Sequence, residues 1–163
     1  MMKKNFFKLL HSFKYAIKGI GYAILNEQNM RFHIVAAVYV LVFSSFYNFG
    51  ILKYIVLLLT ISSVMAAELL NTGIEAICDA VTKENNNYIK IAKDVSAGAV
   101  LITAISSVAV GIFLFWDIST FVKIINFFKG SIISLLAFIL SIIVSVFFIF
   151  YDLPKKNNNK RSI

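Results

Sequence analysis

The sequence is poor in the residues that break helices and cross-link secreted domains. Its 163 residues include one proline and one cysteine. A single cysteine cannot form a disulfide within the chain, which excludes a small domain held together by disulfides. The proline, Pro154, lies beyond the last long apolar segment, so no proline interrupts such a segment. Long helices are therefore expected, and the lack of alternating segments of about ten residues makes a transmembrane barrel a poor fit.

Motifs that bind nucleotides or metals in soluble enzymes are also missing. No G-x-x-x-x-G-K-[ST] loop occurs, and Gly19 and Gly21 lack the later glycine of a dinucleotide-binding fingerprint. The histidines His11 and His33 do not form H-E-x-x-H, and no CxxC pair is present. A soluble kinase domain does not fit this chain, and zinc chemistry has little support.

Apolar residues dominate what is present. Hydrophobic residues make up 60% of the chain, and its mean hydropathy is +0.83, whereas soluble domains contain about 45–50% apolar residues. A helix needs about 20 apolar residues to cross the hydrocarbon core of a bilayer. The segments that reach or approach this length are 34–49, 51–77, 95–116 and 131–151. The sequence thus predicts an all-α integral membrane protein with four spans.

The positions of lysine and arginine orient these spans, because basic residues are retained on the cytoplasmic side. With both termini inside, all but three of the 16 basic residues fall in cytoplasmic segments; the three outside are Lys53, Lys123 and Lys129. A multi-pass protein of the bacterial inner, or cytoplasmic, membrane is therefore predicted. The net charge of +8 is spread along segments next to apolar spans, which indicates anionic lipid headgroups and not nucleic acid as the partner.

The remaining segments complete the expected organisation. Residues 1–29 mix apolar and basic residues in the pattern of an amphipathic helix on the membrane surface, with a plain cytoplasmic tail as the alternative. Residues 30–116 contain three spans and form the expected core. Residues 117–130 are either an amphipathic external connection or an early start of the fourth span, which covers 131–151. Residues 152–163 form a basic cytoplasmic tail.

The second span carries a polar stripe in its later half. An advance of about 100° per residue places these polar residues within about 60° of Glu68, on one helical face. An ionisable group in a span costs about 2.5–3.5 kcal/mol, so each one is a candidate for function. Oxygen ligands from carboxylates suit Mg²⁺, whereas hydrogen bonding between helices is the structural alternative. The polar stripe consists of Glu68, Asn71, Thr72, Glu75 and Asp79.

More charged residues gather at the cytoplasmic boundary of the spans. Glu27 and Arg31 are four residues apart, a spacing that permits an ion pair, although Glu27 is equally placed to bind a metal. Lys93 and Asp94 precede the third span, with small residues behind them that allow close helix packing. Glu68 lies about 10 Å deeper in the membrane. A phosphoryl donor held in water by metal and lysine would face this carboxylate, and such positioning suits phosphoryl transfer to a lipid.

Four segments carry a more specific pattern. They are Y-A-I-K-G at 15–19, N-E-Q-N-M-R-F-H at 26–33, E-L-L-N-T-G-I-E-A-I-C-D at 68–79 and A-K-D-V-S-A-G-A-V at 92–100. On these residues the chain resembles the prokaryotic diacylglycerol kinase family, and especially its Gram-positive branch of undecaprenol kinases. Their order and separation fit the family without gaps over residues 8–116. The E-x-x-N-x-x-x-E block followed by A-K-D is too specific a combination for a chance match.

The resemblance implies a lipid kinase that uses ATP and Mg²⁺ to phosphorylate a lipid alcohol, either undecaprenol or diacylglycerol. It also implies a homotrimer of three-span subunits, with composite active sites at the subunit interfaces that face the cytoplasm. Glu68 would be the general base at the substrate hydroxyl, Asn71 would support it and Arg31 would lie near the lipid headgroup. Glu27 and Glu75 would bind the metal. The residues implied to bind the nucleotide and its metal are Lys8, Tyr15, Glu27, Glu75, Glu84, Lys93 and Asp94.

Two features depart from the family pattern, and two other functions compete with it. Asn86 stands where the family often has a histidine, and the span at 131–151 is additional. We expect this span to pack on the outside of the trimer without a catalytic role.

A small cation transporter or channel subunit is the alternative, but a fixed Lys93 at its mouth disfavours a cation pathway. A structural membrane subunit would use the polar stripe only to join helices.

Overall fold

The computed structural model describes residues 2–81 and 86–151. Within these ranges the chain is helical, with short connections and no strand, which confirms the all-α prediction. The helices are α1 (Met2–Asn26), α2 (Gln28–Ser44), α3 (Ile51–Val81), α4 (Asn87–Phe115), α5 (Ile118–Gly130) and α6 (Ile132–Phe150).

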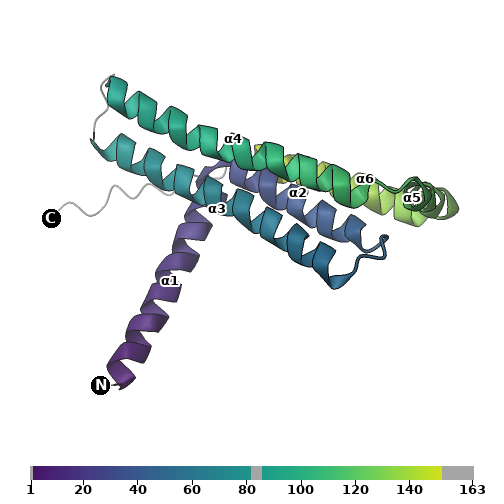
Figure 1. The fold of residues 1–163 in the computed structure, drawn as a ribbon, viewed down its shortest axis with the longest axis horizontal. Coiled ribbons are helices and arrows are strands. Elements are labelled where there is room, and N and C mark those ends of the chain that lie inside the picture. Colours follow the sequence, from purple (N-terminus) through teal and green to yellow (C-terminus); the bar gives the residue numbers. More distant parts are fainter. Residues whose placement is uncertain (1, 82–85, 152–163) are drawn as a thin grey trace.

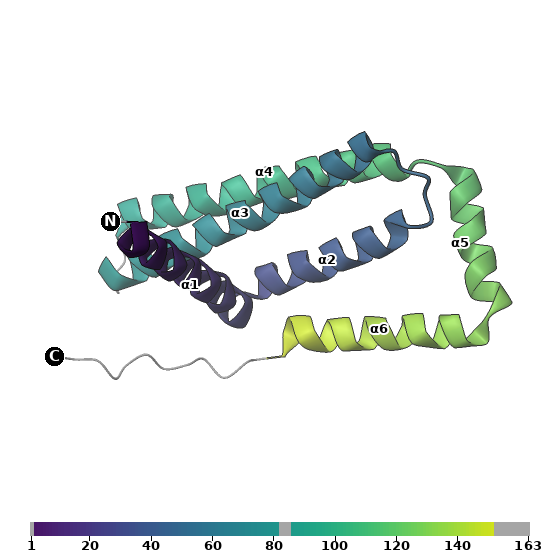
Figure 2. The ribbon, with the colours of Figure 1, turned by 90° about the horizontal axis from the view of Figure 1, so that it is seen from below.

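Four of these helices, α2, α3, α4 and α6, run along a common direction, whereas α1 leaves them at a steep angle (Figures 1 and 2). Helices α3 and α4 are joined by the short connection after Val81 and form the most extensive helix pair. Helix α2 packs against α3 on one side and against α6 on the other. The last turns of α3 and the first turns of α4 form one end of the bundle, and α2 begins well short of this end (Figure 2).

Three of the described helices are long and apolar enough to cross a membrane by length and composition: α3 with 31 residues, α4 with 29 and α6 with 19. Helix α2 has 17 residues, the lower end of the range of about 17–25 for a span. It corresponds to the first expected span, 34–49. It begins at Gln28 and ends at Ser44, so both of its ends come earlier in the sequence than expected. Helices α3 and α4 instead extend beyond their expected limits, to Val81 and from Asn87.

Side chains that accept hydrogen bonds from backbone amides set the starts of three helices. Such caps satisfy amide groups that have no partner within the first helical turn. The acceptor and donor pairs are Asn86 Oδ1 with Tyr88 N (2.9 Å), Asp117 Oδ1 with Ser119 N (3.0 Å) and Ser131 Oγ with Ser134 N (3.3 Å). The caps at Asp117 and Ser131 make α5 a helix separate from α6, and Figure 2 shows α5 crossing the end of the bundle between α4 and α6.

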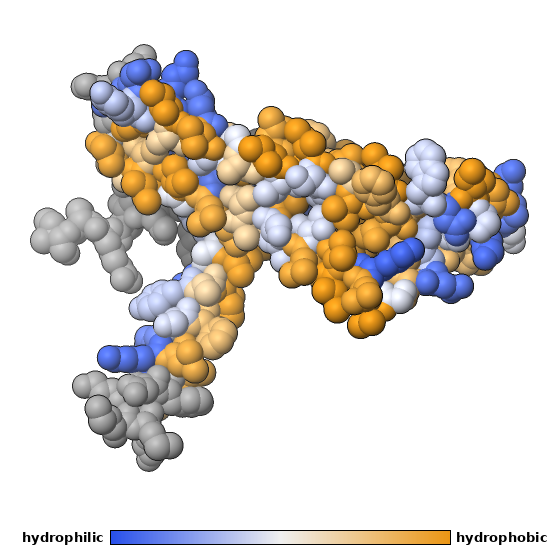
Figure 3. Space-filling view, viewed as in Figure 1, coloured by the Kyte–Doolittle hydropathy of each residue, from blue (hydrophilic) through white to orange (hydrophobic). Residues whose placement is uncertain are grey.

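Apolar side chains cover the middle of the bundle on the face shown in Figure 3, and hydrophilic residues gather toward its ends and on α1. Many large apolar side chains are exposed, including Leu70, Ile102 and Ile143. A monomeric soluble protein rarely exposes so much contiguous apolar surface. This distribution fits helices whose outer faces contact lipid or other membrane-embedded chains.

The pH dependence of α5 follows from its capping carboxylate. The Thr120 hydroxyl donates to Asp117 Oδ2 at 2.7 Å and the Ser119 hydroxyl to Oδ1 at 2.8 Å. These bonds lower the pKa of Asp117 from 3.8 to about 2. The ionised carboxylate thus stabilises the folded helix fully at pH values above its ordinary pKa of 3.8. This contribution to stability is lost as the pH falls toward 2.

We therefore expect the amides at the start of α5 to lose protection from hydrogen exchange between pH 4 and about 2, after correction for intrinsic exchange. Asp117→Asn should abolish this step, because asparagine also caps helices but does not titrate. A step of the same size in the Asp117→Asn variant would contradict the assignment.

Candidate active site

The buried polar side chains of α3 lie on the face expected from helical spacing. Glu68, Asn71 and Thr72 are 1%, 6% and 6% exposed. Glu75, further along the helix, is partly buried, and Asp79 is exposed. The polar stripe therefore runs from the interior of the bundle to its surface, at the end where α3 and α4 are connected.

Glu68 is the most deeply buried charged residue of the described chain. Within the described ranges neither of its carboxylate oxygens makes a hydrogen bond of standard geometry, although the side chain of Asn29 in the first turn of α2 lies near. A buried carboxylate without a partner is costly, so Glu68 is a candidate for binding a ligand or exchanging a proton. Glu27, in the turn between α1 and α2, and Glu75 are both close enough to act on it electrostatically. The fold thus places Glu68 within electrostatic range of two other acidic residues, one on α3 and one in the turn before α2.

A chain of hydrogen bonds joins the polar stripe to α4. The Ser96 hydroxyl donates to Asn71 Oδ1 at 2.6 Å, and Asn71 Nδ2 donates to Glu75 Oε1 at 3.1 Å. Asn71 therefore fixes the Glu75 carboxylate while its own orientation is fixed from the neighbouring helix. Sequence reasoning missed Ser96; the available signal was its position three residues after Lys93, on the same helical face.

Ser96→Ala should destabilise the protein, because it leaves the buried acceptor of Asn71 without its donor. We expect a loss of about 1 kcal/mol or more in the free energy of unfolding, measured by denaturant titration in detergent. The matched control is Ser106→Ala on the same helix, whose exposed hydroxyl donates to the carbonyl of Ile102 in the preceding helical turn. Equal effects of the two substitutions would contradict a specific role for Ser96.

The outer end of the polar stripe also contacts α4. Lys93 forms an ion pair with Asp79, and Asp94, the next residue, is exposed. Both partners of the pair are substantially exposed, and exposed ion pairs contribute only about 0–1 kcal/mol. Little free energy would therefore oppose the transfer of Lys93 from Asp79 to a phosphate. Glu84, the other nucleotide contact expected in this region, lies outside the described residues.

The two candidate nucleotide contacts of α1 are exposed. Lys8 and Tyr15 are largely open to solvent, and within the described chain neither forms a hydrogen bond to the polar stripe. Their helix nevertheless crosses α3 close to the site. An open groove of about 450 Å³ lies at this crossing, lined by Ala16, Gly19, Ile20 and Tyr22 of α1 and by Leu69, Thr72, Gly73 and Ala76 of α3.

Arg31 is buried in the first turns of α2, next to the same turn that contains Glu27. Its guanidinium donates to the backbone carbonyls of Ile24 and Leu25 in α1 and of Ile149 in α6. These bonds direct the guanidinium to the C-terminal ends of two helices. A contact between Arg31 and the lipid headgroup stays a prediction.

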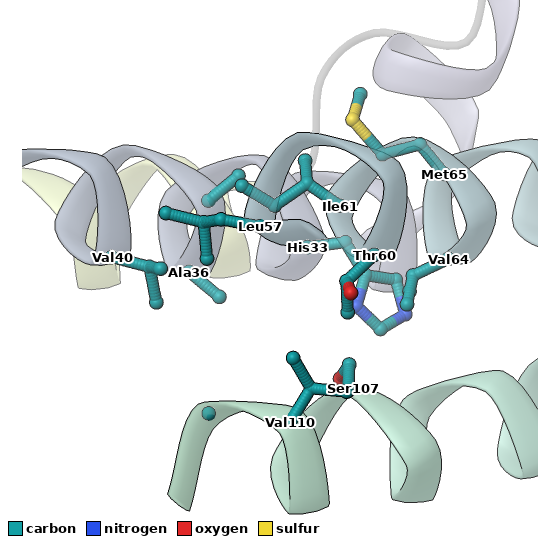
Figure 4. A pocket seen from close by; sticks show the side chains of 12 residues that line it. His33, Ala36, Val40, Leu57, Thr60, Ile61, Val64, Met65, Ser107 and Val110 are labelled. Atoms are coloured by element: carbon teal, nitrogen blue, oxygen red, sulfur yellow. The ribbon is translucent and has the colours of Figure 1, made fainter. Parts of the chain in front are cut away.

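A small cavity lies between α2, α3 and α4, on the side of Glu68 away from the charged end of α3 (Figure 4). Its volume is about 100 Å³, and Val64 in its lining is one helical turn before Glu68. The polar side chains His33, Thr60 and Ser107 line it together with the apolar or small residues Ala36, Ala37, Val40, Leu57, Ile61, Val64, Met65, Val110 and Gly111.

Sequence comparison gives the relatives of this chain. The family described as prokaryotic diacylglycerol kinase matches residues 14–115. The diacylglycerol kinase of Synechocystis is 42% identical over 104 residues, 63% of this chain and 59% of that protein. The undecaprenol kinase of Bacillus subtilis is 36% identical over 111 residues, 68% of this chain and 88% of that protein. The diacylglycerol kinase of Escherichia coli K12 is 30% identical over 113 residues, 69% of this chain and 93% of that protein.

A bundle of apolar helices with a buried carboxylate near a charged end defines a multi-pass membrane protein with an enzyme-like site. The chain belongs to the prokaryotic diacylglycerol kinase family. The family and the names of its members support a lipid kinase, and none of them favours a cation transporter or channel subunit. Helices α5 and α6 lie outside the matched residues, and the match spans 59% of the length of the Synechocystis protein.

Proposed function

We propose that the chain is an ATP- and Mg²⁺-dependent kinase that phosphorylates the hydroxyl of a lipid alcohol at the cytoplasmic face of the membrane. The burial of Glu68 without a hydrogen bond of standard geometry, within electrostatic range of Glu27 and Glu75, is the observation on which this proposal rests. Undecaprenol is the proposed substrate and diacylglycerol the alternative, since the names of the relatives include both.

Glu68 acts as the general base in this proposal. Its carboxylate accepts the proton of the lipid hydroxyl while the hydroxyl oxygen bonds to the γ-phosphorus of ATP, and the bond from that phosphorus to ADP breaks. A positioned base contributes about 10²- to 10⁴-fold to such a step. Asn71, held by Ser96 and bonded to Glu75, maintains the spacing between the base and the nucleotide end of the polar stripe.

The nucleotide binds at the exposed end of the stripe. The described residues contain no cluster of three or more His, Cys, Asp or Glu that could hold a metal ion. Mg²⁺ commonly takes one or two carboxylates and completes its shell with phosphates and water, so Glu27 and Glu75 fit it. When bound, the ion would neutralise charge on the phosphates of ATP. The other proposed nucleotide contacts are Lys8, Tyr15, Glu84, Lys93 and Asp94.

The family resemblance also suggests a homotrimer with composite sites, and the exposed apolar faces of α3 and α4 support this proposal. Leu70, Ile77 and Leu101 are each more than half exposed on these helices. Packing between copies would cover part of this surface, and a neighbouring copy would add side chains to the groove between α1 and α3. Cross-linking in detergent should therefore give a trimeric species.

The test of the activity is transfer of label from radioactive ATP. The purified protein in detergent is given Mg²⁺ and either undecaprenol or diacylglycerol, and chelation of Mg²⁺ is the control. We expect labelled lipid with one or both substrates and none after chelation. No labelled lipid from either substrate would overturn the proposed function and return the transporter and structural alternatives to consideration.

A further inference from the structure

Arg31 joins three helices at the site end of the bundle. Its Nε donates to the carbonyl of Ile149 at 3.1 Å, and its Nη1 donates to the carbonyls of Ile24 and Leu25 at 3.2 Å each. Helix α1 ends at Asn26 and α6 ends at Phe150. All three carbonyls therefore lie in a last helical turn, where carbonyls lack partners within their own helix.

The charge of Arg31 is matched by these helix ends. The C-terminus of a helix carries about −0.5 elementary charge, so two such ends together roughly balance one guanidinium. This balance, together with the three hydrogen bonds, offsets the cost of burying a side chain that is only 5% exposed. The planar fork of the guanidinium donates in several directions at once, which a lysine ammonium at the same position does not reproduce.

Helix α6 is attached to α2 at a second level. The hydroxyl of Tyr39 lies 3.0 Å from that of Ser141 and 3.2 Å from that of Ser145. The Tyr39 ring also meets Phe138 edge to face, with 6.1 Å between centroids. Tyr39 is eight residues after Arg31, about 12 Å along the helix. Together, the contacts of Arg31 and Tyr39 with α6 fix the rotation of α6 about its axis and its position along α2.

We propose that Arg31 is a positioning residue through which α6 holds the turn that carries Glu27. The carbonyls that Arg31 binds in α1 directly precede this turn, and Arg31 itself lies in the first turns of α2. The C-terminus of α6 supplies one of the hydrogen bonds and about half of the charge that keep the guanidinium in place. Because this inference rests on the proposed function of Glu27 in metal binding, it gives α6 an indirect effect on catalysis.

A double-mutant cycle in the full chain tests this coupling. Arg31→Lys keeps the positive charge but loses the planar guanidinium that donates in several directions. A second variant, the α6 release, combines Tyr39→Phe, Ser141→Ala and Ser145→Ala and removes the hydrogen bonds of the Tyr39 hydroxyl with α6. We expect each to raise the Mg²⁺ concentration for half-maximal rate by about tenfold, the low end for residues that support metal ligands, with a smaller change in kcat. Their combination should not exceed the larger single effect, since both act through one contact. Tyr54→Phe is the matched control for loss of a tyrosine hydroxyl and should change neither quantity.

Hydrogen exchange of the amides at 27–31 gives a second readout that does not require activity. Both variants should increase exchange there, again without adding. Additive effects, or an α6 release that leaves exchange and Mg²⁺ dependence unchanged, would overturn the inference. If the wild type labels no lipid, the proposed function fails, and exchange in the same cycle then decides whether α6 holds the Glu27 turn. If Arg31→Lys does not fold, the α6 release and Tyr54→Phe alone decide it.

Discussion

Replacement of Glu68 by glutamine is expected to lower the rate of lipid phosphorylation by about 10²- to 10⁴-fold. Glutamine has nearly the same shape but cannot take the proton of the lipid hydroxyl. Glu68 is buried within the bundle, whereas Lys93 and Asp94 lie toward the surface, so the affinity for ATP should change little. Initial rates of label transfer at saturating Mg²⁺ and equilibrium binding of ATP measure the two quantities separately.

Asp117→Asn is the matched control for this substitution. It makes the same exchange of carboxylate for amide at an exposed position on the connection between α4 and α5, and it should leave the rate unchanged. A Glu68→Gln variant that still phosphorylates lipid at a near-normal rate would rule out Glu68 as the base. A large loss of ATP affinity would instead assign Glu68 to nucleotide binding.

The membrane-spanning character and the shared face of the polar stripe could be predicted because both depend on local sequence. Apolar run length predicts a span, and the helical period places Glu68, Asn71 and Thr72 on one side. The bond from Ser96 to Asn71 depends instead on the rotation of α4 against α3. That rotation follows from how the side chains of both helices interdigitate, which local periodicity does not give.

Arg31 illustrates the limit of sequence reasoning more sharply. Its spacing from Glu27 permits an ion pair and equally leaves Glu27 to bind a metal, but it does not predict the hydrogen bond from Arg31 to a carbonyl 118 residues away. Every residue has a backbone carbonyl, so residue identity does not reveal which carbonyl accepts this hydrogen bond. The bond therefore could not be predicted from the sequence. The paired serines of α6, Ser141 and Ser145, were visible at a four-residue spacing, but only the fold shows that Tyr39 contacts both.

Glu75→Gln is expected to raise the Mg²⁺ concentration for half-maximal rate by at least about tenfold, by comparison with the effects of mutating residues that only support metal ligands. The substitution removes a charge from the proposed metal site but keeps a side-chain oxygen that can accept from Asn71 Nδ2. The hydrogen bonds between α3 and α4 should therefore persist. Rates measured over a Mg²⁺ titration at a fixed total concentration of ATP give the requirement.

The decisive comparison is with Glu68→Gln under the same conditions. Excess Mg²⁺ should restore much of the rate of Glu75→Gln, because a weakened site is still filled at a higher concentration. It should restore none of the rate of Glu68→Gln, since no metal concentration replaces a missing base. An unchanged Mg²⁺ requirement for Glu75→Gln would remove Glu75 from the metal site. Recovery of Glu68→Gln by Mg²⁺ would instead make Glu68 a metal ligand, so the two titrations separate the roles of these carboxylates on one helical face.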